Sequence, residues 1–337
     1  MTFQTETLVE VTRGGHVESE HRGAIAVVDA TGQLIAHVGD AQLVSYLRSS
    51  AKPFQLLPLI ESGAADRFGL TDAELAIIAG SHSGEPRHVA AVQSILNKIG
   101  LPDNALQCGV NVPFNPDSAQ ALRAAGREPT VLYNNCSGKH AGMLAQAIDR
   151  GLSTADYLDP HHPIQVAIRQ RLAELAELPL DQVSVGIDGC SAPCFAMPLS
   201  ASALAFAKLA DAKSGALQRV TRVMMTYPEM VAGEGRLDTD LMRAVPQRVV
   251  SKGGAEGYHG LGIVAKNGPA LGVALKIGDG DGKRGGHPVV IEALRQLGVL
   301  NEAALAALKN YYTWKITNHR GLEVGEVRAN FQLRRDV

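Results

Sequence analysis

The order of strand-like and helix-like segments constrains this fold most, because strand patterns stand near both ends of the chain and helix patterns fill its middle. Two apolar runs, 23–29 and 33–38, flank Thr31-Gly32, which is typical of a hairpin turn. The later segments RVVSKG, GYHGLGIVAKNG and ALGVALKIGDG indicate further strands, with a favoured turn at Asn267-Gly268. This order is not a regular strand–helix alternation. It predicts an α/β (α+β) fold whose antiparallel sheet is formed by both chain ends around an inserted helical subdomain.

The helical middle is expected because apolar residues recur there at spacings of three and four, with Gly or Pro between the runs. We expect the sheet portion at 1–50 and 245–337 and the mainly helical portion at 51–244. The Gly-rich run 278–286 lacks the spacing of a phosphate-binding loop and is expected to be a surface turn. The predicted helices are 52–62, 71–79, 86–99, 118–125, 137–150, 163–178, 201–210, 216–226, 288–297 and 302–309.

Composition narrows the class of protein. The 337 residues carry 34 acidic and 32 basic side chains, and 45% of them are hydrophobic, so the chain is not a disordered one. The near-neutral charge and the 4% aromatic content argue against nucleic acid as a partner. No apolar run approaches the ~20 residues that span a bilayer, and the N-terminus lacks a signal-peptide pattern. We therefore expect a soluble, cytoplasmic protein without membrane partners.

Ser49 and Lys52 form an S-x-x-K pattern that could activate a serine nucleophile. On a helix beginning near Ser49, the two side chains share one face. A lysine amine kept neutral by burial or a nearby cation can accept the serine proton. The same pattern also fits a simple helix cap with a solvated lysine.

Three further segments offer polar groups in Gly-rich turns. Ser81, in AGSHSGE, is either a second active-site hydroxyl or part of a helix start. Lys252 ends an apolar strand before two glycines, which would let a substrate approach the strand or merely form a turn. Glu234 could hold a substrate ammonium group or cap the next helix.

Two of the four cysteines lie in polar loops, Cys136 in NNCSGKH and Cys190 in DGCSAPC. Thiolates beside Asp or His are plausible zinc ligands, although neither segment has a C-x-x-C spacing. The alternative is a pair of buried free thiols. Reduced cysteines suit a cytosolic chain of this size.

Taken together, six ordered segments resemble the rhizobial-type, or class 3, L-asparaginases of the asparaginase II family. The segments are RSSAKPFQ, AGSHSGEPRH, NNCSGKHAGML, GIDGCSAPCFAMPL, PEMVAGEGR and GVALKIGDG. The resemblance covers nearly the whole chain. It implies a fold like that of serine β-lactamases, penicillin-binding proteins and serine-dependent glutaminases, with the active site between the two portions.

The resemblance implies two Ser–Lys tandems, Ser49 with Lys52 and Ser81 with Lys252; Lys266 and Lys276 match the motif less well. Ser49 is then the expected nucleophile toward the side-chain amide of L-asparagine, with Lys52 accepting its proton and Ser81 and Lys252 relaying one to ammonia. A zinc ion is expected beside the serines, shaping the pocket. The implied zinc ligands are Cys136, Lys139, Cys190 and, as an adjacent donor, Asp188.

The expected substrate-binding residues are Arg48, Asn135, His140 and Glu234, and the expected assembly is a homodimer. The alternatives are a serine-dependent glutaminase, a β-lactamase or D,D-peptidase, and a non-catalytic protein that binds an amino acid or a metal. The absence of K-T-G after the candidate strand argues against the β-lactam enzymes, since Lys252 is followed by Gly-Gly. Cys194 is an extra thiol of unassigned role.

Overall fold

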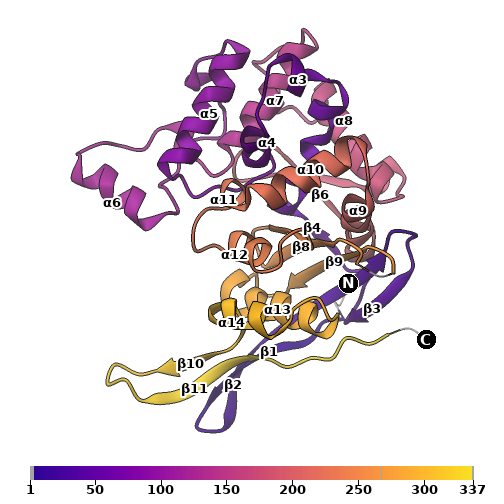
Figure 1. The fold of residues 1–337 in the computed structure, drawn as a ribbon, viewed down its shortest axis with the longest axis vertical. Helices are drawn as coiled ribbons and strands as arrows, with labels where there is room; N and C mark the ends of the chain where they lie inside the picture. The colour runs from indigo at the N-terminus through magenta and orange to yellow at the C-terminus, as the bar shows by residue number, and fades with distance from the viewer. Residues whose placement is uncertain (1–3, 267, 336–337) are drawn as a thin grey trace. The chain divides into compact units, whose positions relative to one another are not determined.

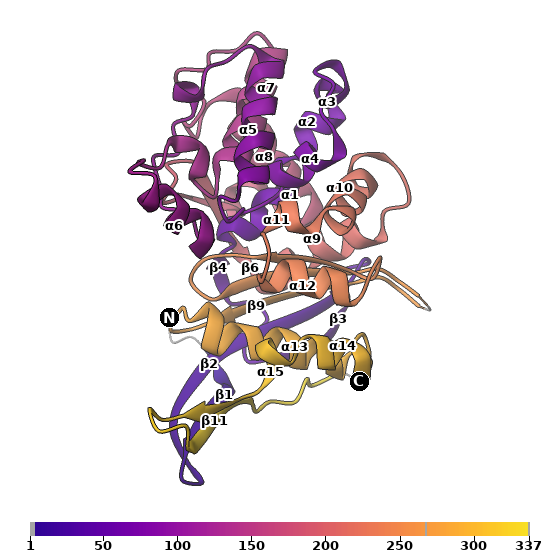
Figure 2. The same cartoon turned by 60° about the vertical axis from the view of Figure 1, so that its left-hand side comes forward.

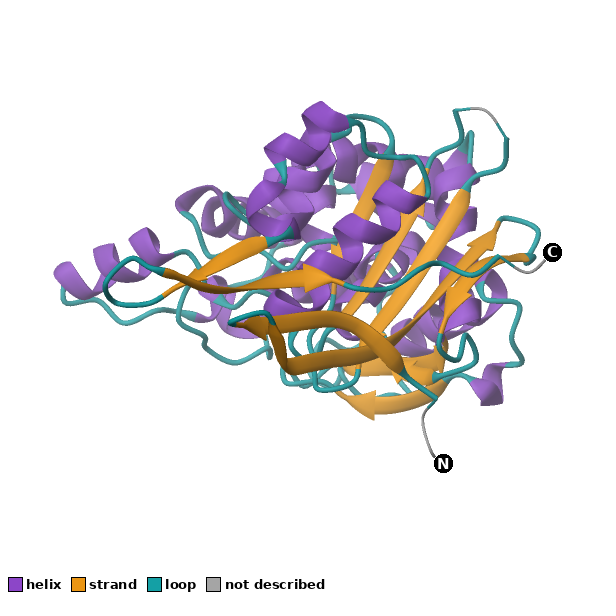
Figure 3. Cartoon of the chain, turned by 90° about the horizontal axis from the view of Figure 1, so that it is seen from below, coloured by secondary structure: helices purple, strands orange, loops and turns teal. Residues whose placement is uncertain are grey.

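The two ends of the chain meet in one antiparallel sheet of eight strands in the computed structural model, which describes residues 4–266 and 268–335. This arrangement confirms the predicted fold class. The sheet runs in the order β10-β11-β1-β2-β9-β8-β7, and β3 also pairs with β2. Figure 1 labels most of these strands, and Figure 3 shows the strands in orange. Its strands are β1 (Glu6–Arg13), β2 (His16–Asp29), β3 (Leu34–Val38), β7 (Val249–Gly253), β8 (Tyr258–Ile263), β9 (Leu271–Ile277), β10 (Trp314–Thr317) and β11 (Glu323–Ala329).

Strand β2 joins the N-terminal and C-terminal parts of the sheet. Its first half pairs with β1 across a two-residue turn, Gly14-Gly15, whose φ angles of 55° and 86° suit a hairpin and favour glycine. Its second half pairs with β3 on one edge and with β9 on the other. The β8–β9 pair is antiparallel, as expected, but Asn267 of the predicted turn lies outside the described residues.

Helix α9 (Leu199–Asp211) packs directly on this sheet, over β2, β8 and β9. Glycines on the strands make the close approach possible. A Cβ at Gly260 would collide with the Phe206 ring, and one at Gly272 would collide with the Ala203 carbonyl. In Figures 1 and 2, the β1–β2 and β10–β11 hairpins extend beyond α13 (His287–Gln296).

The chain forms two compact units. The sheet unit comprises residues 1–50, 197–211 and 240–337, and the helical unit comprises 51–196 and 212–239. The sheet unit thus includes α9, which the sequence placed in the helical portion. Besides strand β5 (Ser184–Ile187), which pairs with β6 (Pro193–Pro198), the helical unit is built from helices.

Most predicted helices form within a few residues of their expected bounds. The observed helices are α1 (Lys52–Gln55), α2 (Leu57–Glu61), α3 (Ala64–Arg67), α4 (Asp72–Ile78), α5 (Pro86–Ile99), α6 (Pro116–Ala124), α7 (Ser137–Asp149), α8 (Pro163–Leu175), α10 (Gly215–Thr226), α11 (Pro228–Val231), α12 (Leu237–Ala244), α14 (Glu302–Ala307) and α15 (Lys309–Tyr312), with α9 and α13 as above. Short 3₁₀ turns occur at η1 (Arg48–Ala51), η2 (Asp103–Ala105), η3 (Val131–Tyr133) and η4 (Leu180–Gln182), and β4 (Val44–Tyr46) is a short strand.

Three expectations about local structure are wrong. The predicted helix 52–62 is divided into α1 and α2, because Pro58 lacks the N–H that would continue the helix. The chain does not finish in helices, since β10 and β11 follow them. The run 278–286 is more than a turn: Gly282–Gly286 forms a π-helical turn whose first N–H groups are capped by Asp281. No helix in the described part of the chain is long and apolar enough to cross a membrane.

Candidate active site

The amine of Lys52 is the centre of a hydrogen-bonded cluster inside the helical unit. Lys52 is the first residue of α1 and only 1% exposed. Its Nζ donates to Ser81 Oγ at 2.9 Å, to the Gly80 carbonyl at 2.7 Å and to the Asn135 carbonyl at 3.2 Å. The fold therefore brings together residues that lie about 30 and 80 positions apart in the sequence.

Burial lowers the pKa of Lys52, because a charged amine is costly to remove from water. The neighbouring Lys139 charge lowers the pKa further, while Cys136 opposes the shift. A lowered pKa increases the neutral fraction of the amine near neutral pH. A neutral amine carries a lone pair that can accept a hydroxyl proton, so Lys52 can act as a base toward Ser81.

The segment that carries Ser81 is held firmly by α11. The Ser81 backbone N–H donates to the Val231 carbonyl at 2.7 Å. Gly80 makes the approach possible, since a Cβ there would lie 2.7 Å from the Val231 oxygen and 2.8 Å from the Met230 oxygen. The requirement for glycine at position 80 follows from this backbone contact.

Glu234 lies in the loop after α11, near the start of α5. Its backbone N–H donates to Glu85 Oε1 at 2.9 Å, and its carboxylate pairs with Arg87 at 3.3 Å. The Glu234 side chain is 45% exposed. The backbone contact fixes the loop, and the carboxylate is accessible to a solute.

Two thiols and a second lysine gather beside Lys52. Cys136, at the start of α7, and Cys190, in the loop after β5, are both buried. Lys139 Nζ donates to Cys190 Sγ at 2.9 Å, and Lys139 is 4% exposed. We call Cys136, Lys139 and Cys190 the thiol–lysine cluster.

The charges of this cluster are strongly coupled. A hydrogen bond from the Cys190 thiol lowers the pKa of Cys136 well below its usual range, and the two lysine charges act in the same direction against burial. The same hydrogen bond, together with burial, raises the pKa of Cys190. Burial works to lower the pKa of Lys139, but its interactions with Cys136 and Cys190 raise that pKa overall. These directions favour the negative charge at Cys136 and the positive charge at Lys139.

Asp188 and Cys194 lie close to this cluster in the chain. Asp188 opens the turn after β5, where its N–H donates to the Ala192 carbonyl at 2.9 Å, and its charge helps to raise the pKa of Lys139. Cys194 is buried in β6 opposite Gly186. Among the described residues no group of three or more His, Cys, Asp or Glu could hold a metal.

The other expected catalytic residues, Ser49 and Lys252, belong to the sheet unit. Lys252 lies on β7 and is 1% exposed. Its carbonyl accepts a 2.6 Å hydrogen bond from Ser50 Oγ, next to Ser49, and its Nζ donates to the Gly253 carbonyl. Gly254 allows this approach, because a Cβ there would lie 2.5 Å from the Leu47 oxygen. The end of β7 is thus packed against the turn that carries Ser49.

Arg48 and the competing lysines differ in their surroundings. Arg48, in the same turn as Ser49, has a φ of 50°, which is uncommon for a residue with a side chain and is often found at functional sites. Lys276 on β9 bonds to the Glu256 and Ile277 carbonyls at one end of its strand. Lys266 is exposed in the loop between β8 and β9. Lys252 is the most buried of the three candidate lysines.

His140 is fully buried on α7, and its hydrogen-bond partner is a residue that the sequence reasoning missed. Tyr157 Oη lies 2.7 Å from His140 Nδ1 and accepts a hydrogen bond from the Gln107 N–H at 2.9 Å. Tyr157 is also fully buried. Its surroundings in the sequence, STADYLDP, read as an ordinary polar loop, so no local pattern indicates its position.

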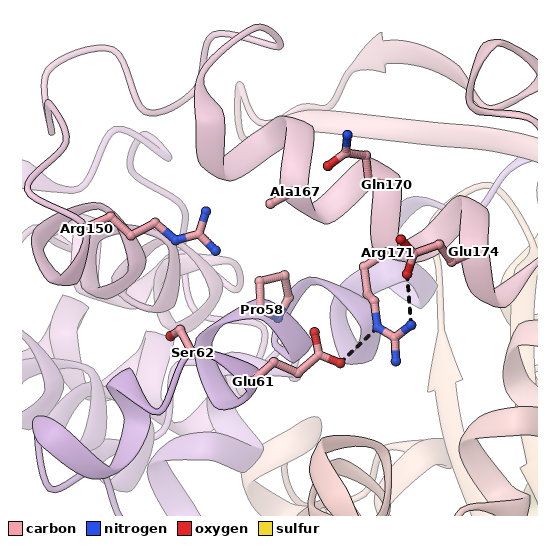
Figure 4. A pocket seen from close by; sticks show the side chains of 8 residues that line it. All are labelled: Pro58, Glu61, Ser62, Arg150, Ala167, Gln170, Arg171 and Glu174. Atoms are coloured by element: carbon pink, nitrogen blue, oxygen red, sulfur yellow. Dashed lines mark hydrogen bonds and ion pairs between the residues drawn. The ribbon is translucent and has the colours of Figure 1, made fainter.

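A surface hollow of the helical unit lies away from these residues. Figure 4 shows this pocket of about 440 Å³, in which Arg171 pairs with Glu61 at 2.8 Å and with Glu174 at 3.0 Å. Arg150 projects from the opposite side. Its lining, within the described ranges, includes none of the expected catalytic, substrate-binding or metal-binding residues.

Comparisons with known proteins identify the family. In the solved structures, a Bacillus glutaminase crystallised in 4.3 M NaCl matches with a TM-score of 0.38 and 11% identity, over 82% of this chain and 91% of the glutaminase chain. Mglu in its L-glutamate-binding form matches with a TM-score of 0.35 and 16% identity, over 82% of this chain and 59% of the Mglu chain. A search of curated proteins finds no match. The family profile described as L-asparaginase II matches residues 9–329, nearly the whole chain. The chain is therefore an amidohydrolase that belongs to the L-asparaginase II family.

Proposed function

We propose that this protein hydrolyses the side-chain amide of L-asparagine to L-aspartate and ammonia. The observation that carries the proposal is the buried Lys52 amine, which has a lowered pKa and lies 2.9 Å from the Ser81 hydroxyl. In the neutral amine, two N–H groups can serve the Gly80 and Asn135 carbonyls while the lone pair faces Ser81. This arrangement suits proton transfer from a serine.

In the proposed mechanism Ser49 attacks the substrate carbonyl carbon and forms a β-aspartyl ester. Lys52 accepts the serine proton, and Ser81 and Lys252 pass a proton to the departing ammonia. Water then cleaves the ester, which releases L-aspartate and restores the hydroxyl. The charge of Lys139 disfavours the charged form of Lys52, which helps Lys52 to stay neutral.

The contact between Lys52 and Ser81 also favours a competing assignment, in which Ser81 is the nucleophile. Rapid quenching during turnover of L-asparagine, followed by peptide mass spectrometry, separates the two assignments. An ester on the peptide that contains Ser49, together with abolished turnover in a folded Ser49→Ala variant, supports Ser49 as the nucleophile. An ester on the peptide with Ser81, with near-normal kcat in Ser49→Ala, would make Ser81 the nucleophile.

We propose that Arg48, Asn135, His140 and Glu234 bind the amino-acid part of the substrate. Glu234 would pair with the α-ammonium group, because its carboxylate is nearly half exposed and already balances one cation, Arg87. Arg48 would attract the α-carboxylate. The Asn135 carbonyl accepts a hydrogen bond from Lys52, and His140 follows Lys139 on α7.

The substrate is tested by measuring ammonia release from L-asparagine and from L-glutamine, together with turnover of a β-lactam. The longer glutamine side chain differs by one methylene, which a pocket discriminates by only ~1–3 kcal/mol. We expect kcat/KM to be highest for asparagine, with measurable glutamine activity and no β-lactam turnover. Preference for glutamine would make the protein a glutaminase. No turnover of either amide would support a non-catalytic, ligand-binding role.

We also propose that the thiol–lysine cluster holds a zinc ion. Two sulfur atoms and one nitrogen are donors that zinc favours, and Lys139 Nζ and Cys190 Sγ are already 2.9 Å apart in a buried site. Asp188 is a further candidate donor in the adjoining turn. When bound, zinc would supply a fixed positive charge that shapes the substrate pocket by joining the two loops.

Zinc binding is tested by metal analysis and kinetics on wild type and Cys190→Ala. Because Lys139 and Cys190 must lose protons to coordinate, binding should strengthen as the pH rises. We expect about one zinc per chain in the wild type, and a larger effect of its removal on KM than on kcat. Zinc-supplemented wild type that binds no metal would contradict the proposal. We further propose a homodimer, from the family resemblance, which light scattering measures directly.

A further inference from the structure

In three buried histidines of the helical unit, His82, His88 and His140, the hydrogen-bond partners determine which ring nitrogen carries the proton. At His82 the Gly84 backbone N–H donates to Nδ1 at 3.2 Å, so Nδ1 is an acceptor. Nε2 of His82 lies 2.9 Å from Ser137 Oγ, and the Ser137 hydroxyl donates to the Leu132 carbonyl at 2.9 Å. A neutral His82 therefore carries its proton on Nε2 and donates it to Ser137.

His88 has the same arrangement of hydrogen bonds, with Nδ1 as the acceptor and Nε2 as the donor. Its Nδ1 accepts from the Glu85 N–H at 3.1 Å, and its Nε2 lies 2.7 Å from the Glu229 carbonyl, which can only accept. Both nitrogens of His88 thus have partners, like those of His82. In each ring a donor on the Nδ1 side fixes the proton on Nε2.

The contacts of Tyr157 also fix the proton of His140 on Nε2. The Tyr157 oxygen accepts from the Gln107 N–H, so its own single proton remains to be donated. His140 Nδ1, at 2.7 Å, is the acceptor in reach. If Nδ1 carried the proton instead, the hydroxyl proton would have no acceptor among the described residues. His140 is therefore held with its proton on Nε2.

His140 differs from the other two histidines in one respect. Its Nε2 is buried and makes no hydrogen bond within the described part of the chain, whereas the corresponding atoms of His82 and His88 both donate. A buried donor without a partner is costly, at about 1–3 kcal/mol. The described residues supply no acceptor for the Nε2–H of His140, so an acceptor on a bound ligand would remove this free-energy cost.

The proposed substrate supplies an acceptor of a suitable kind. Its α-carboxylate is ionised near neutral pH, and a hydrogen bond to a charged acceptor is stronger than one to a neutral group. His140 has no lone pair left for a metal, because Nε2 carries its proton and the Nδ1 lone pair accepts from Tyr157, and this separates His140 from the proposed zinc donors.

We propose that His140 donates its Nε2–H to a carboxylate of the amino-acid ligand, and that Tyr157 is the positioning residue that makes His140 a donor. The inference rests on the proposed function for the identity of the ligand. The role of Tyr157 rests on hydrogen-bond geometry alone. Gln165 supports the arrangement, since its side-chain amide donates to the Tyr157 carbonyl at 2.8 Å.

The tautomer is tested by NMR on protein labelled with ¹⁵N-histidine, with the His140 signals assigned from their loss in His140→Gln. In the wild type we expect His140, His82 and His88 all to be protonated at Nε2. In Tyr157→Phe the proton of His140 should redistribute toward Nδ1, while His82 and His88 stay unchanged as internal controls. A wild-type His140 protonated at Nδ1, or a His140 unaffected by Tyr157→Phe, would overturn the role of Tyr157.

The ligand is tested with L-aspartate, the proposed product. Its addition should shift the Nε2 signal of His140 but not those of His82 and His88. Tyr157→Phe should raise KM for asparagine about 10-fold with kcat changed less than about threefold, the size expected for one hydrogen bond to a charged group. In the His140→Gln background, where the amide N–H needs no tautomer, the same change should have little effect on KM.

The matched control is Tyr312→Phe, which removes a hydroxyl that donates to Glu292 at 2.6 Å in the sheet unit and should leave KM unchanged. An unchanged His140 signal on addition of L-aspartate, or a loss confined to kcat, would overturn the ligand assignment. If asparagine is not hydrolysed at all, the proposed function fails. The NMR comparison of wild type and Tyr157→Phe still decides the role of Tyr157 in that case.

Discussion

At the scale of single residues, the proposed chemistry depends on two buried lysines, Lys52 and Lys252. We predict that Lys52→Met and Lys252→Met each lower kcat about 10²–10⁴-fold, the usual contribution of a general acid or base. The double variant should lose little more, because residues that act as one unit are not additive. Steady-state kinetics checks this, with Lys276→Met as the control that keeps activity. Independent, multiplicative losses would contradict a shared proton path.

The lowered pKa of Lys52 also predicts a pH profile. In the proposed mechanism the base is the neutral amine, whose fraction rises with pH, so kcat/KM should increase with pH through the pKa of Lys52. Because burial lowers that pKa, the rise should fall below the ~10.4 of an ordinary lysine. A pH–rate profile measures it. A rise that begins only near the ordinary lysine value would mean that Lys52 is not the base.

At the scale of elements, the position of Ser81 depends on the contact between its loop and α11. We predict that Gly80→Ala lowers activity at least about 10-fold and stability by about 1–3 kcal/mol, because the new Cβ meets two backbone oxygens of α11 that cannot turn away. Kinetics and thermal unfolding measure both effects. Gly282→Ala is the matched control, since its nearest neighbour lies 3.9 Å away. Equal behaviour of the two variants would contradict the tight contact.

Elements with strong local signals could be predicted from the sequence, and elements that depend on distant contacts could not. Helix α5 has its predicted bounds, 86–99, because Pro86 starts it and Gly100 ends it. The two valines of strand β11, Val324 and Val327, lie three residues apart and do not follow the two-residue alternation of a strand, so the pairing of β11 with β1 is what makes it a strand. In the same way, Ser81 lies in a polar, Gly-flanked segment that could be noticed in the sequence but fitted a helix start as well, whereas the proposed role of Tyr157 depends only on contacts with Gln107 and His140.

At the scale of the whole molecule, the sheet depends on the return of the chain to its own beginning. Strand β11 covers the edge of β1, pairing Val9 with Ala329 and Val11 with Val327, and these valines are buried. Removal of residues 313–337 would expose that edge and its apolar side chains. An exposed strand edge is a template for pairing with other chains.

We therefore predict that a chain ending at Tyr312 unfolds at a lower temperature than the full chain and forms larger assemblies. Calorimetry and light scattering measure the two effects. The control is Lys315→Ala in the full chain, which removes only a 2.9 Å surface ion pair with Glu326, a contact worth about 0–1 kcal/mol, and leaves the strands in place. A shortened chain with the unfolding temperature and assembly size of the full chain would show that the sheet is complete without β10 and β11. We expect the lower unfolding temperature and the larger assemblies because β1, without β11, changes from an inner strand to an edge strand.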